Sequence, residues 1–529
     1  MLSIKNFSIS IKNKTLLQDI NFEVKEGEIF GIIGESGSGK SLLSSAITKL
    51  YPKYSQIKGD IIFENRNILH LQKNEIENIR GKKISMIFQE PMTALNPLLT
   101  IRRQIIEPLL IHTKKSKKEI YHLTEKKLNQ VGLNSKDNLS DLYPHQLSGG
   151  QRQRAMIALA TILKPKILIA DEPTSSLDVY NQSKIIKLLK KLSFEDKITI
   201  IFITHDLTLL SHMVENLIIL KDKKIVEKGN LKEIFSCKKQ NYAKRLLVES
   251  NLDKLNLGQN QKKIELLKVI NLTKTYNEKK LSLRKKKQTP AIKKLNLTIN
   301  KGECLGIVGP SGCGKSTLAK SLLGLINTDE GEILLNKTQI NLKEKFKKDV
   351  RKKIQIVFQD PYSSFNPRHK IKKIISEPFF LHKSKYSKKE LYIILKNLIE
   401  SVGMKTSDLE KFPHQFSGGQ RQRIAIARAL STNPELIVLD EALSALDVII
   451  KKKILILLKN LSIKYNLSYL FITHDLNLVK VIANNIIIMK KGKIVETGDP
   501  KEVLKNPKKK FTRQLIDCSI QLPEKWLQE

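Results

Sequence analysis

Two glycine-rich strings in this chain have the residue types that cradle phosphate groups. GESGSGKS spans Gly34–Ser41 and GPSGCGKS spans Gly309–Ser316, and each follows an apolar run and precedes a helix-like stretch. Glycines let backbone N–H groups turn toward an anion, and the helix N-terminus adds partial positive charge. The lysine can reach terminal phosphates and the serine can ligate Mg²⁺. We therefore predict nucleotide binding by Gly34, Ser36, Gly37, Gly39, Lys40 and Ser41, and again by Gly309, Ser311, Gly312, Gly314, Lys315 and Ser316.

Two adjacent carboxylates end an apolar run in each half of the chain, as Asp171–Glu172 and Asp440–Glu441. Ligands of open α/β sheets lie at the carboxyl ends of strands. We predict that Asp171 and Asp440 belong to a magnesium shell. Glu172 and Glu441 are the candidate catalytic bases, which would orient water on the γ-phosphate.

Gln89 and Gln359 also follow apolar runs and can reach both metal and water, so we include them among the ATP and metal ligands. His205 and His474 end further apolar runs. A single histidine at such a position is usually only hydrogen-bonded, but two in matched positions favour a catalytic contact to the γ-phosphate.

Each half also contains Ser-Gly-Gly-Gln at the start of a helix-like stretch. This arrangement makes a second anion-binding helix N-terminus in a domain that already has one. The presence of a second anion-binding site in one domain is explained if that site faces the nucleotide bound by the other copy. The predicted ligands are Ser148, Gly149, Gly150 and Gln151, and Ser417, Gly418, Gly419 and Gln420.

The motifs recur in the same order, and from Ser148 to His205 each has its counterpart 269 residues later. We predict domain 1 at residues 1–250, a polar linker at 251–263 and domain 2 at 264–529. A flexible join of this length reaches only ~20 Å, which predicts that the two copies pack against each other.

Alternating apolar runs and helix-like stretches predict an α/β fold with a parallel-sheet nucleotide-binding core in each copy. The strand-like segments of the first copy include Leu2–Ile11, Ile20–Val24 and Glu28–Ile33, and a periodic, charged stretch at Ile101–Val131 indicates a helical insert. The second copy has the matching insert at Ile371–Val402.

Taken together, these motifs resemble the ATP-binding-cassette (ABC) ATPases over essentially the whole chain. The resemblance implies two tandem P-loop NTPase domains, each with a RecA-like core, an antiparallel β subdomain and a helical subdomain, with ATP and Mg²⁺ as cofactors. It also implies a head-to-tail arrangement, in which each ATP lies between one copy's phosphate loop and the other copy's signature. Site one would combine the first copy's loop with Ser417–Gln420, and site two the second copy's loop with Ser148–Gln151.

The segments FQEPMTALNPLLTI and FQDPYSSFNPRHKI are similar to those of oligopeptide, dipeptide and nickel importer ATPases, and the arrangement is similar to fused ATPases of the microcin C and oligopeptide importer type. The resemblance implies two membrane permease subunits as partners and, through them, a solute-binding protein. It places Leu95–Pro97 and Phe365–Pro367 near the permeases. The expected location is peripheral, on the cytoplasmic face of the inner membrane.

The amino-acid composition helps to decide which partners and which alternative functions are expected. Lys and Arg number 94 against 52 Asp and Glu, a net charge of +42, but lysine dominates and is spread throughout, so no nucleic-acid partner is expected. The chain shows no secretory signal, membrane-span pattern or paired cysteine motif. The alternative function is a soluble tandem-cassette translation factor on the ribosome, which the charge favours but the short linker does not.

The two sites differ in one predicted adenine contact. ABC ATPases stack adenine on an aromatic residue after the first strand, where the second copy has Tyr276 and the first copy has Ile11. Stacking on a base contributes ~1–3 kcal/mol, so we expect weaker ATP binding at site one. Single-site affinity measurements check this, and equal affinities would contradict it.

Overall fold

The structure, a computed structural model, describes residues 1–12, 14–35, 37–133, 139–175, 177–236, 242–250, 264–277, 288–340, 348–381, 386–444 and 446–519, with Leu255, Leu522 and Trp526. Ser36 and the predicted linker 251–263, apart from Leu255, lie outside the described residues. The chain divides into a first unit, Met1–Asn251 with Ile520–Glu529, and a second unit, Leu252–Ser519.

The first unit is built on a six-stranded sheet with the order β10-β9-β3-β8-β7-β6. Five of its strands run parallel, and β10 is an antiparallel edge strand. The central strands are buried along their whole length, as expected for a sheet covered on both faces. The strands are β3 (Ile29–Gly34), β6 (Ile84–Ile87), β7 (Ile167–Asp171), β8 (Thr199–Thr204), β9 (Asn216–Lys221) and β10 (Lys224–Asn230).

A second, antiparallel sheet in this unit has the order β2-β1-β4-β5. Side chains such as Phe7, Ile20 and Ile61 form a core with helix α1 and one face of the central sheet. The strands are β1 (Leu2–Ile11), β2 (Lys14–Val24), β4 (Gln56–Phe63) and β5 (Arg66–Asn67), and α1 spans Lys40–Ile47.

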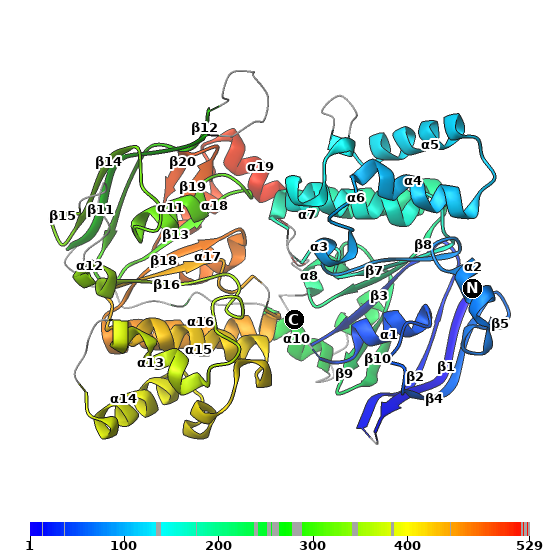
Figure 1. Cartoon of the computed structure of the whole chain (residues 1–529), viewed down its shortest axis with the longest axis horizontal. Coiled ribbons are helices and arrows are strands. Elements are labelled where there is room, and N and C mark those ends of the chain that lie inside the picture. The colour runs from blue at the N-terminus through cyan, green and yellow to red at the C-terminus, as the bar shows by residue number, and fades with distance from the viewer. Residues whose placement is uncertain are drawn as a thin grey trace. The chain divides into compact units, whose positions relative to one another are not determined.

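The opposite face of the central sheet is covered by helices, grouped above β3, β7 and β8 in Figure 1. The predicted insert Ile101–Val131 contains two helices because Ser116 accepts a hydrogen bond from the Glu119 N–H and starts a new one. The remaining helices of the unit are α2 (Lys73–Ile79), α3 (Pro91–Ala94), α4 (Ile101–His112), α5 (Lys117–Gln130), α6 (Gly149–Thr161), α7 (Val179–Asp196), α8 (Leu207–Ser211), α9 (Leu231–Ser236) and α10 (Tyr242–Ser250).

The second unit repeats both sheets, with the orders β12-β11-β14-β15 and β16-β17-β18-β13-β19-β20. The predicted α/β class is therefore confirmed in both copies. Its strands are β11 (Glu265–Asn277), β12 (Gln288–Asn300), β13 (Cys304–Val308), β14 (Glu330–Leu335), β15 (Thr338–Ile340), β16 (Ile354–Val357), β17 (Leu436–Asp440), β18 (Ser468–Thr473), β19 (Asn485–Lys490) and β20 (Lys493–Gly498). Its helices are α11 (Lys315–Leu322), α12 (Lys348–Lys353), α13 (Ile371–Leu381), α14 (Lys388–Ser401), α15 (Gly418–Leu430), α16 (Val448–Tyr465), α17 (Leu476–Ile482), α18 (Pro500–Lys505) and α19 (Lys510–Cys518).

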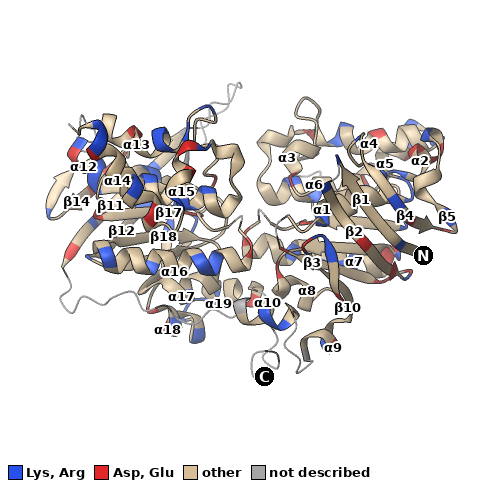
Figure 2. Cartoon of the chain, turned by 90° about the horizontal axis from the view of Figure 1, so that it is seen from below, with Lys and Arg blue, Asp and Glu red and all other residues tan. Residues whose placement is uncertain are grey.

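The basic residues are distributed over both units and are interspersed with acidic ones (Figure 2). This distribution agrees with lysines on solvated faces of helices and strands. Among the described residues, no helix combines the length and apolar character that crossing a bilayer requires.

The end of the chain belongs to the first unit. Trp526, the only tryptophan in the sequence, stacks on Phe235 of α9, with ring centroids 5.0 Å apart and planes at 21°. Leu522 also packs against the helical core of that unit. The first unit therefore contains residues from both ends of the chain.

The second glycine of each Ser-Gly-Gly-Gln motif is required by helix packing. A Cβ on Gly419 would lie 2.5 Å from Cγ2 of Ile450 on α16, and one on Gly150 would lie 2.8 Å from Cγ of Asn181 on α7. The first glycines, Gly149 and Gly418, meet nothing closer than 3.6 Å. Only the second glycine of each motif is therefore fixed by sterics within its own unit.

We predict that Gly419→Ala destabilises the second unit by ~1–3 kcal/mol, because the added methyl group overpacks the contact with β-branched Ile450. Gly418→Ala is the matched control, since its Cβ would meet Leu446 Cδ2 at an ordinary 3.6 Å. Chemical denaturation of both variants checks this. Equal stability of the two alanine variants would contradict it.

Candidate active sites

Each phosphate loop holds its lysine in the same way. Lys40 is buried after β3, and its Nζ donates to the carbonyl oxygens of Gly34 at 2.8 Å and Glu35 at 2.9 Å. Lys315 donates to Gly309 at 2.8 Å and Pro310 at 3.1 Å. The loop backbone thus fixes both ammonium groups where they can meet a phosphate.

Gly39 and Gly314 start the helices that follow the loops, and both need to be glycine. Their φ angles are 103° and 109°, a left-handed region that residues with a Cβ rarely adopt. A Cβ would also lie 2.5 Å from Leu17 Cδ2 and 2.3 Å from the Ala291 carbonyl oxygen, respectively. Because glycine has no Cβ, the loop can turn at this crowded position directly into α1 or α11.

Asp171 ends β7, and its buried carboxylate is only partly hydrogen-bonded. The Ser44 hydroxyl donates to its Oδ2 at 3.4 Å, while Oδ1 is buried without a hydrogen-bond partner among the described residues. Burial raises the pKa of Asp171, and hydrogen bonding from Ser41 only partly opposes this. A carboxylate oxygen of this kind, beside serine hydroxyls, fits a hard divalent cation.

Asp440 repeats this arrangement at the end of β17. Ser316 Oγ donates to its Oδ1 at 3.3 Å, and burial raises its pKa as well. The structure thus brings the predicted metal ligands Ser316 and Asp440 together.

Glu172 follows Asp171, and each of its two carboxylate oxygens has a hydrogen-bond partner. Gln89 Nε2 donates to one of its oxygens at 2.9 Å, and His205 Nδ1 lies 3.0 Å from the other. Burial opposes ionisation of Glu172, but the hydrogen bond and charge of His205 and the charge of Lys40 outweigh it and lower the pKa. These neighbours therefore favour the ionised form of Glu172, which a general base requires.

Glu441 has the same neighbours in the second unit with looser geometry. Gln359 Nε2 donates to its Oε2 at 3.1 Å, and His474 Nδ1 lies 3.6 Å away, beyond hydrogen-bond distance. Lys315 Nζ lies 3.8 Å from the other oxygen. Burial opposes ionisation of Glu441 as well, but His474 and Lys315 lower its pKa.

Both glutamates have a left-handed backbone, with φ of 46° at Glu172 and 48° at Glu441. The Glu172 N–H donates to the Ile203 carbonyl at 2.9 Å, and the Glu441 N–H donates to Ile472 at 2.9 Å. The neighbouring strand thus stabilises a conformation that is costly for a residue with a Cβ. This conformation turns each chain sharply at the end of β7 or β17.

The Ser-Gly-Gly-Gln motifs start α6 and α15. Ser148 Oγ accepts from the Gln151 N–H at 3.4 Å, and Gln151 Oε1 accepts from the Ser148 N–H at 2.9 Å. Ser417 Oγ likewise accepts from the Gln420 N–H at 3.4 Å, and Gln420 Oε1 accepts from the Ser417 N–H at 3.0 Å. Both signature sequences are therefore preformed capping boxes at exposed helix N-termini.

A cavity of about 280 Å³ in the first unit collects many of the predicted residues. Its lining includes Gly37, Gly39, Lys40 and Ser41 of the loop together with Gln89 and Glu172, and Leu16, Leu42 and Lys223 complete it. The loop and the carboxylate edge of the sheet thus face one space large enough for phosphate groups.

Ile11 and Tyr276 occupy matching positions at the ends of β1 and β11, and 44% of Tyr276 is exposed, so its ring is accessible.

The comparisons with known proteins agree with this geometry. The family model described as ABC transporter matches residues 17–175 and 292–444. The chain belongs to the ABC transporter family. Both of its units are ABC ATPase domains, and the resemblance seen in the sequence is confirmed.

Relatives match over nearly the full length of this ABC ATPase. It is 36% identical to the peptidoglycan transport ATP-binding protein YejF of Agrobacterium fabrum over 99% of this chain and 97% of the relative. It is 37% identical to the ABC transporter ATP-binding protein YejF of Escherichia coli K12, over 98% and 99%. The glutathione import ATP-binding protein GsiA of Pectobacterium atrosepticum is 35% identical over 98% and 89%.

Sequence reasoning missed the contact between helix α10 and the first phosphate loop of this ATPase. The Tyr242 hydroxyl donates to the Glu35 carboxylate, and Lys221 lies 4.4 Å from the centre of the Tyr242 ring. The second unit has Phe511 and Pro310 at these positions, which cannot form such a bond, while Lys490 still covers the Phe511 ring at 4.1 Å. A comparison of the two copies, at an offset of 275 for the phosphate loop and 269 for α10, would have revealed the difference.

We predict that Asp171→Asn stabilises the protein in the absence of nucleotide and metal at neutral pH. The raised pKa of Asp171 means that its ionised form costs folding energy, so stability falls as pH rises above its unfolded pKa. Removal of the charge should raise the melting temperature by roughly 2–4 °C, which corresponds to about 1 kcal/mol in a domain of this size.

The same variant should lose the added stability that Mg²⁺ and ATP give the wild type, as scanning calorimetry with and without both ligands can measure. Asp349→Asn is the control, because that side chain is 89% exposed. A variant that melts below the wild type without ligands would contradict the prediction.

Proposed function

We propose that this chain is the ATP-hydrolysing subunit of an importer for peptides or related small solutes. The observation that carries the proposal is the full set of Lys, Gln, Asp, Glu and His at the sheet edge of both units, in a chain whose full-length relatives are named as transport and import ATP-binding proteins. A second line of support is the importer-like sequence after each of Gln89 and Gln359.

In the proposed mechanism, Lys40 and the loop N–H groups hold the β- and γ-phosphates of one ATP. Glu172 accepts a proton from the attacking water, which Gln89 helps to orient. His205 keeps Glu172 ionised and contacts the γ-phosphate. The second unit uses Lys315, Glu441, Gln359 and His474 in the same roles, and the signature residues of each unit bind the nucleotide held by the other.

Magnesium would be held by Ser41, Asp171 and Gln89 in the first unit and by Ser316, Asp440 and Gln359 in the second. The partnerless Oδ1 of Asp171 supports this assignment. The ion would neutralise charge on the phosphate oxygens.

Two permease subunits, and a solute-binding protein beyond them, are the proposed partners, with the ATPase peripheral to the cytoplasmic face of the membrane. Leu95 and Phe365 are buried anchors, whereas the adjacent residues Asn96–Pro97 and Asn366–Pro367 are exposed. We propose that these exposed tips contact the permeases and that ATP-driven closure of the units moves them. Salt-washed membrane fractions with and without the permeases test this attachment, and co-sedimentation with ribosomes instead would contradict it.

The ribosome-associated alternative has lost its support. All the relatives described above are named as transport ATP-binding proteins or import ATP-binding proteins. The high charge, its main argument, is dispersed over both units.

We predict that the double variant Glu172→Gln with Glu441→Gln binds ATP but hydrolyses it at least ~10²-fold more slowly, because a general base contributes about 10²–10⁴-fold. Steady-state phosphate release and nucleotide retention after gel filtration check this. The variant should retain ATP in a closed state.

Glu26→Gln is a matched control, since Glu26 lies in an exposed turn before β3. It should hydrolyse ATP at the wild-type rate. If the double variant turned over ATP as fast as this control, the assignment of the two glutamates as bases would be wrong.

A further inference from the structure

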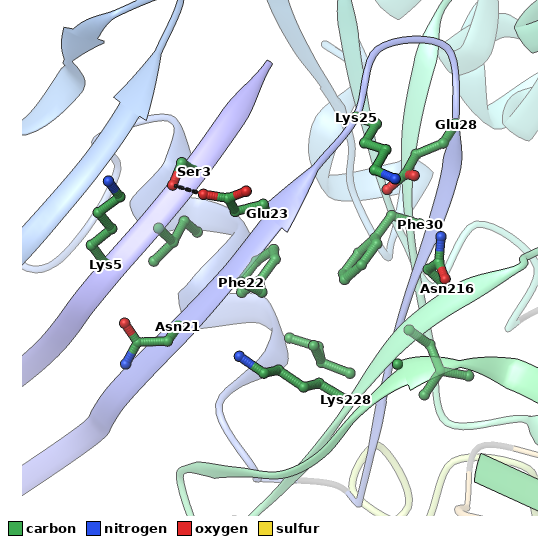
Figure 3. A pocket seen from close by; sticks show the side chains of 14 residues that line it. Ser3, Lys5, Asn21, Phe22, Glu23, Lys25, Glu28, Phe30, Asn216 and Lys228 are labelled. Carbon is green, nitrogen blue, oxygen red and sulfur yellow. Dashed lines mark hydrogen bonds between the residues drawn. The ribbon is translucent and has the colours of Figure 1, made fainter. Parts of the chain in front are cut away.

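A second cavity of the first unit borders packed core residues. It measures about 590 Å³ and lies between the antiparallel sheet and the β10 edge of the central sheet (Figure 3). Phe22 and Phe30 stack on each other in its wall, with ring centroids 5.3 Å apart, and each is only 5% exposed. Neither ring is free to contact a ligand, so this cavity carries no site.

The segments that follow Gln89 and Gln359 are attached to different helices in the two units. These segments carry the exposed tips Asn96–Pro97 and Asn366–Pro367. They align residue by residue at an offset of 270. Each contact in one unit can therefore be compared with its counterpart in the other.

In the second unit, the segment is attached to α15, the helix that begins at the signature residues. Arg428 Nη1 donates to the Ser364 carbonyl oxygen at 2.8 Å, and its Nη2 donates to the Ser364 hydroxyl at 3.0 Å. The same guanidinium lies 4.9 Å from the centre of the Phe365 ring, and the Arg421 guanidinium lies 5.1 Å from that of Tyr362. The two arginines are about two helical turns apart and so share one face of α15. Two hydrogen bonds and two cation–π contacts thus hold the segment on this face.

The surroundings of Arg428 strengthen this attachment. Burial lowers the pKa of Arg428, and the charge of Glu377 on α13 opposes the shift. Hydrogen bonds of a group withdrawn from water are stronger than those of an exposed group. The Phe365 ring under the guanidinium is itself 5% exposed. The contact is therefore a packed joint between the segment and α15.

The first unit lacks this attachment because four of its five residues are different. The counterparts of Tyr362, Ser364, Phe365 and Arg428 are, in that order, Met92, Ala94, Leu95 and Leu159. The counterpart of Arg421 is Arg152, which donates instead to the Leu147 carbonyl oxygen at 3.0 Å. Among the residues described in this unit, no side chain of α6 hydrogen-bonds to residues 91–97.

Gln104 on α4 holds the segment of the first unit. Its Nε2 donates to the carbonyl oxygens of Asn96 and Leu99, both at 3.0 Å, and its Oε1 accepts from the Asn96 N–H at 2.9 Å. Gln104 is 5% exposed, and its counterpart in the second unit is the apolar Ile374. The segment is thus fixed to the helical insert in the first unit and to the signature-bearing helix in the second.

We propose that Arg428 is a positioning residue that couples the tip Asn366–Pro367 to the signature residues of its own unit. A helix is rigid over this length, so a displacement of Ser417–Gln420 reaches Arg428, which lies about three turns further along α15. This inference rests on the proposed function, in which Ser417–Gln420 bind the nucleotide held by the first unit and the tips contact the permeases. Nucleotide binding at site one would then move the permease contact of the second unit.

Hydrogen–deuterium exchange of the full chain, measured by mass spectrometry, tests the coupling. The amide groups of Ser364 and Phe365 donate to the carbonyl oxygens of Pro361 and Tyr362 at 3.2 Å, so their exchange reports on the segment. In the wild type, Mg²⁺ with adenylyl imidodiphosphate should slow this exchange roughly fivefold or more, the lower end of the usual coupling between linked sites. In Arg428→Leu, which takes the first-copy residue, the slowing should fall below about twofold.

A residue with only a structural role would change the exchange rates with and without nucleotide by the same factor, so the response to nucleotide would stay as in the wild type. Arg351→Leu, at an exposed arginine on α12 of the same unit, is the matched control and should keep the full response. The triple variant Tyr362→Met, Ser364→Ala and Phe365→Leu removes both rings and the hydroxyl but leaves α15 unchanged. It gives the same reading should Arg428→Leu fold poorly.

Exchange at the signature residues distinguishes failure of the coupling from failure of the shared ATP site. Loss of the response at residues 361–367 in Arg428→Leu, with the response at residues 417–423 retained, supports the coupling. If Arg428→Leu and the triple variant respond like the wild type, or if only residues 417–423 respond in the wild type, the coupling is wrong and the shared site stands. If neither segment responds in the wild type, both proposals are overturned. The experiment contains no permease, so its outcome does not depend on the importer assignment.

Discussion

The burial of two adjacent carboxylates at the end of one strand is the constraint on which each unit depends. Asp171 and Glu172 would repel each other in a site of low dielectric constant unless the surroundings separate their ionisation. Burial pushes the pKa of Asp171 up, while His205 and Lys40 pull that of Glu172 down. The parallel sheet brings these partners from β3, β7 and β8 to one edge, so the topology is what makes the charge arrangement possible.

The duplication provides an internal control on which features this chemistry requires. Backbone capture of the loop lysine, the left-handed glutamate and the capped signature helix recur in both units. The aromatic residue at the end of the first strand, which is Tyr276 in the second unit and Ile11 in the first, does not recur, and neither does the hydrogen bond from α10 to the phosphate loop. The recurring features therefore define the ATPase, and the others distinguish the two halves.

Most of the site was predictable because its residues belong to contiguous strings at strand ends. The loops, the carboxylate pairs and the glutamines and histidines were found from residue type and spacing, and parallel strands bring such ends together. The left-handed φ of Glu172 was not predictable, since it depends on a bond from its N–H to Ile203 on another strand. Nor was the packing role of Gly150 and Gly419, because the contact with α7 or α16 is set by tertiary structure.

The contact of Trp526 with Phe235 has a consequence for how the chain is made. Ribosomes release a protein from its N-terminus onward, so the first unit emerges and folds before residues near 526 exist. The Phe235 ring on α9 therefore lacks its Trp526 partner while the entire second unit is synthesised. The packing around Phe235 is therefore completed only after the whole second unit has been synthesised, by a side chain that follows that unit in the sequence.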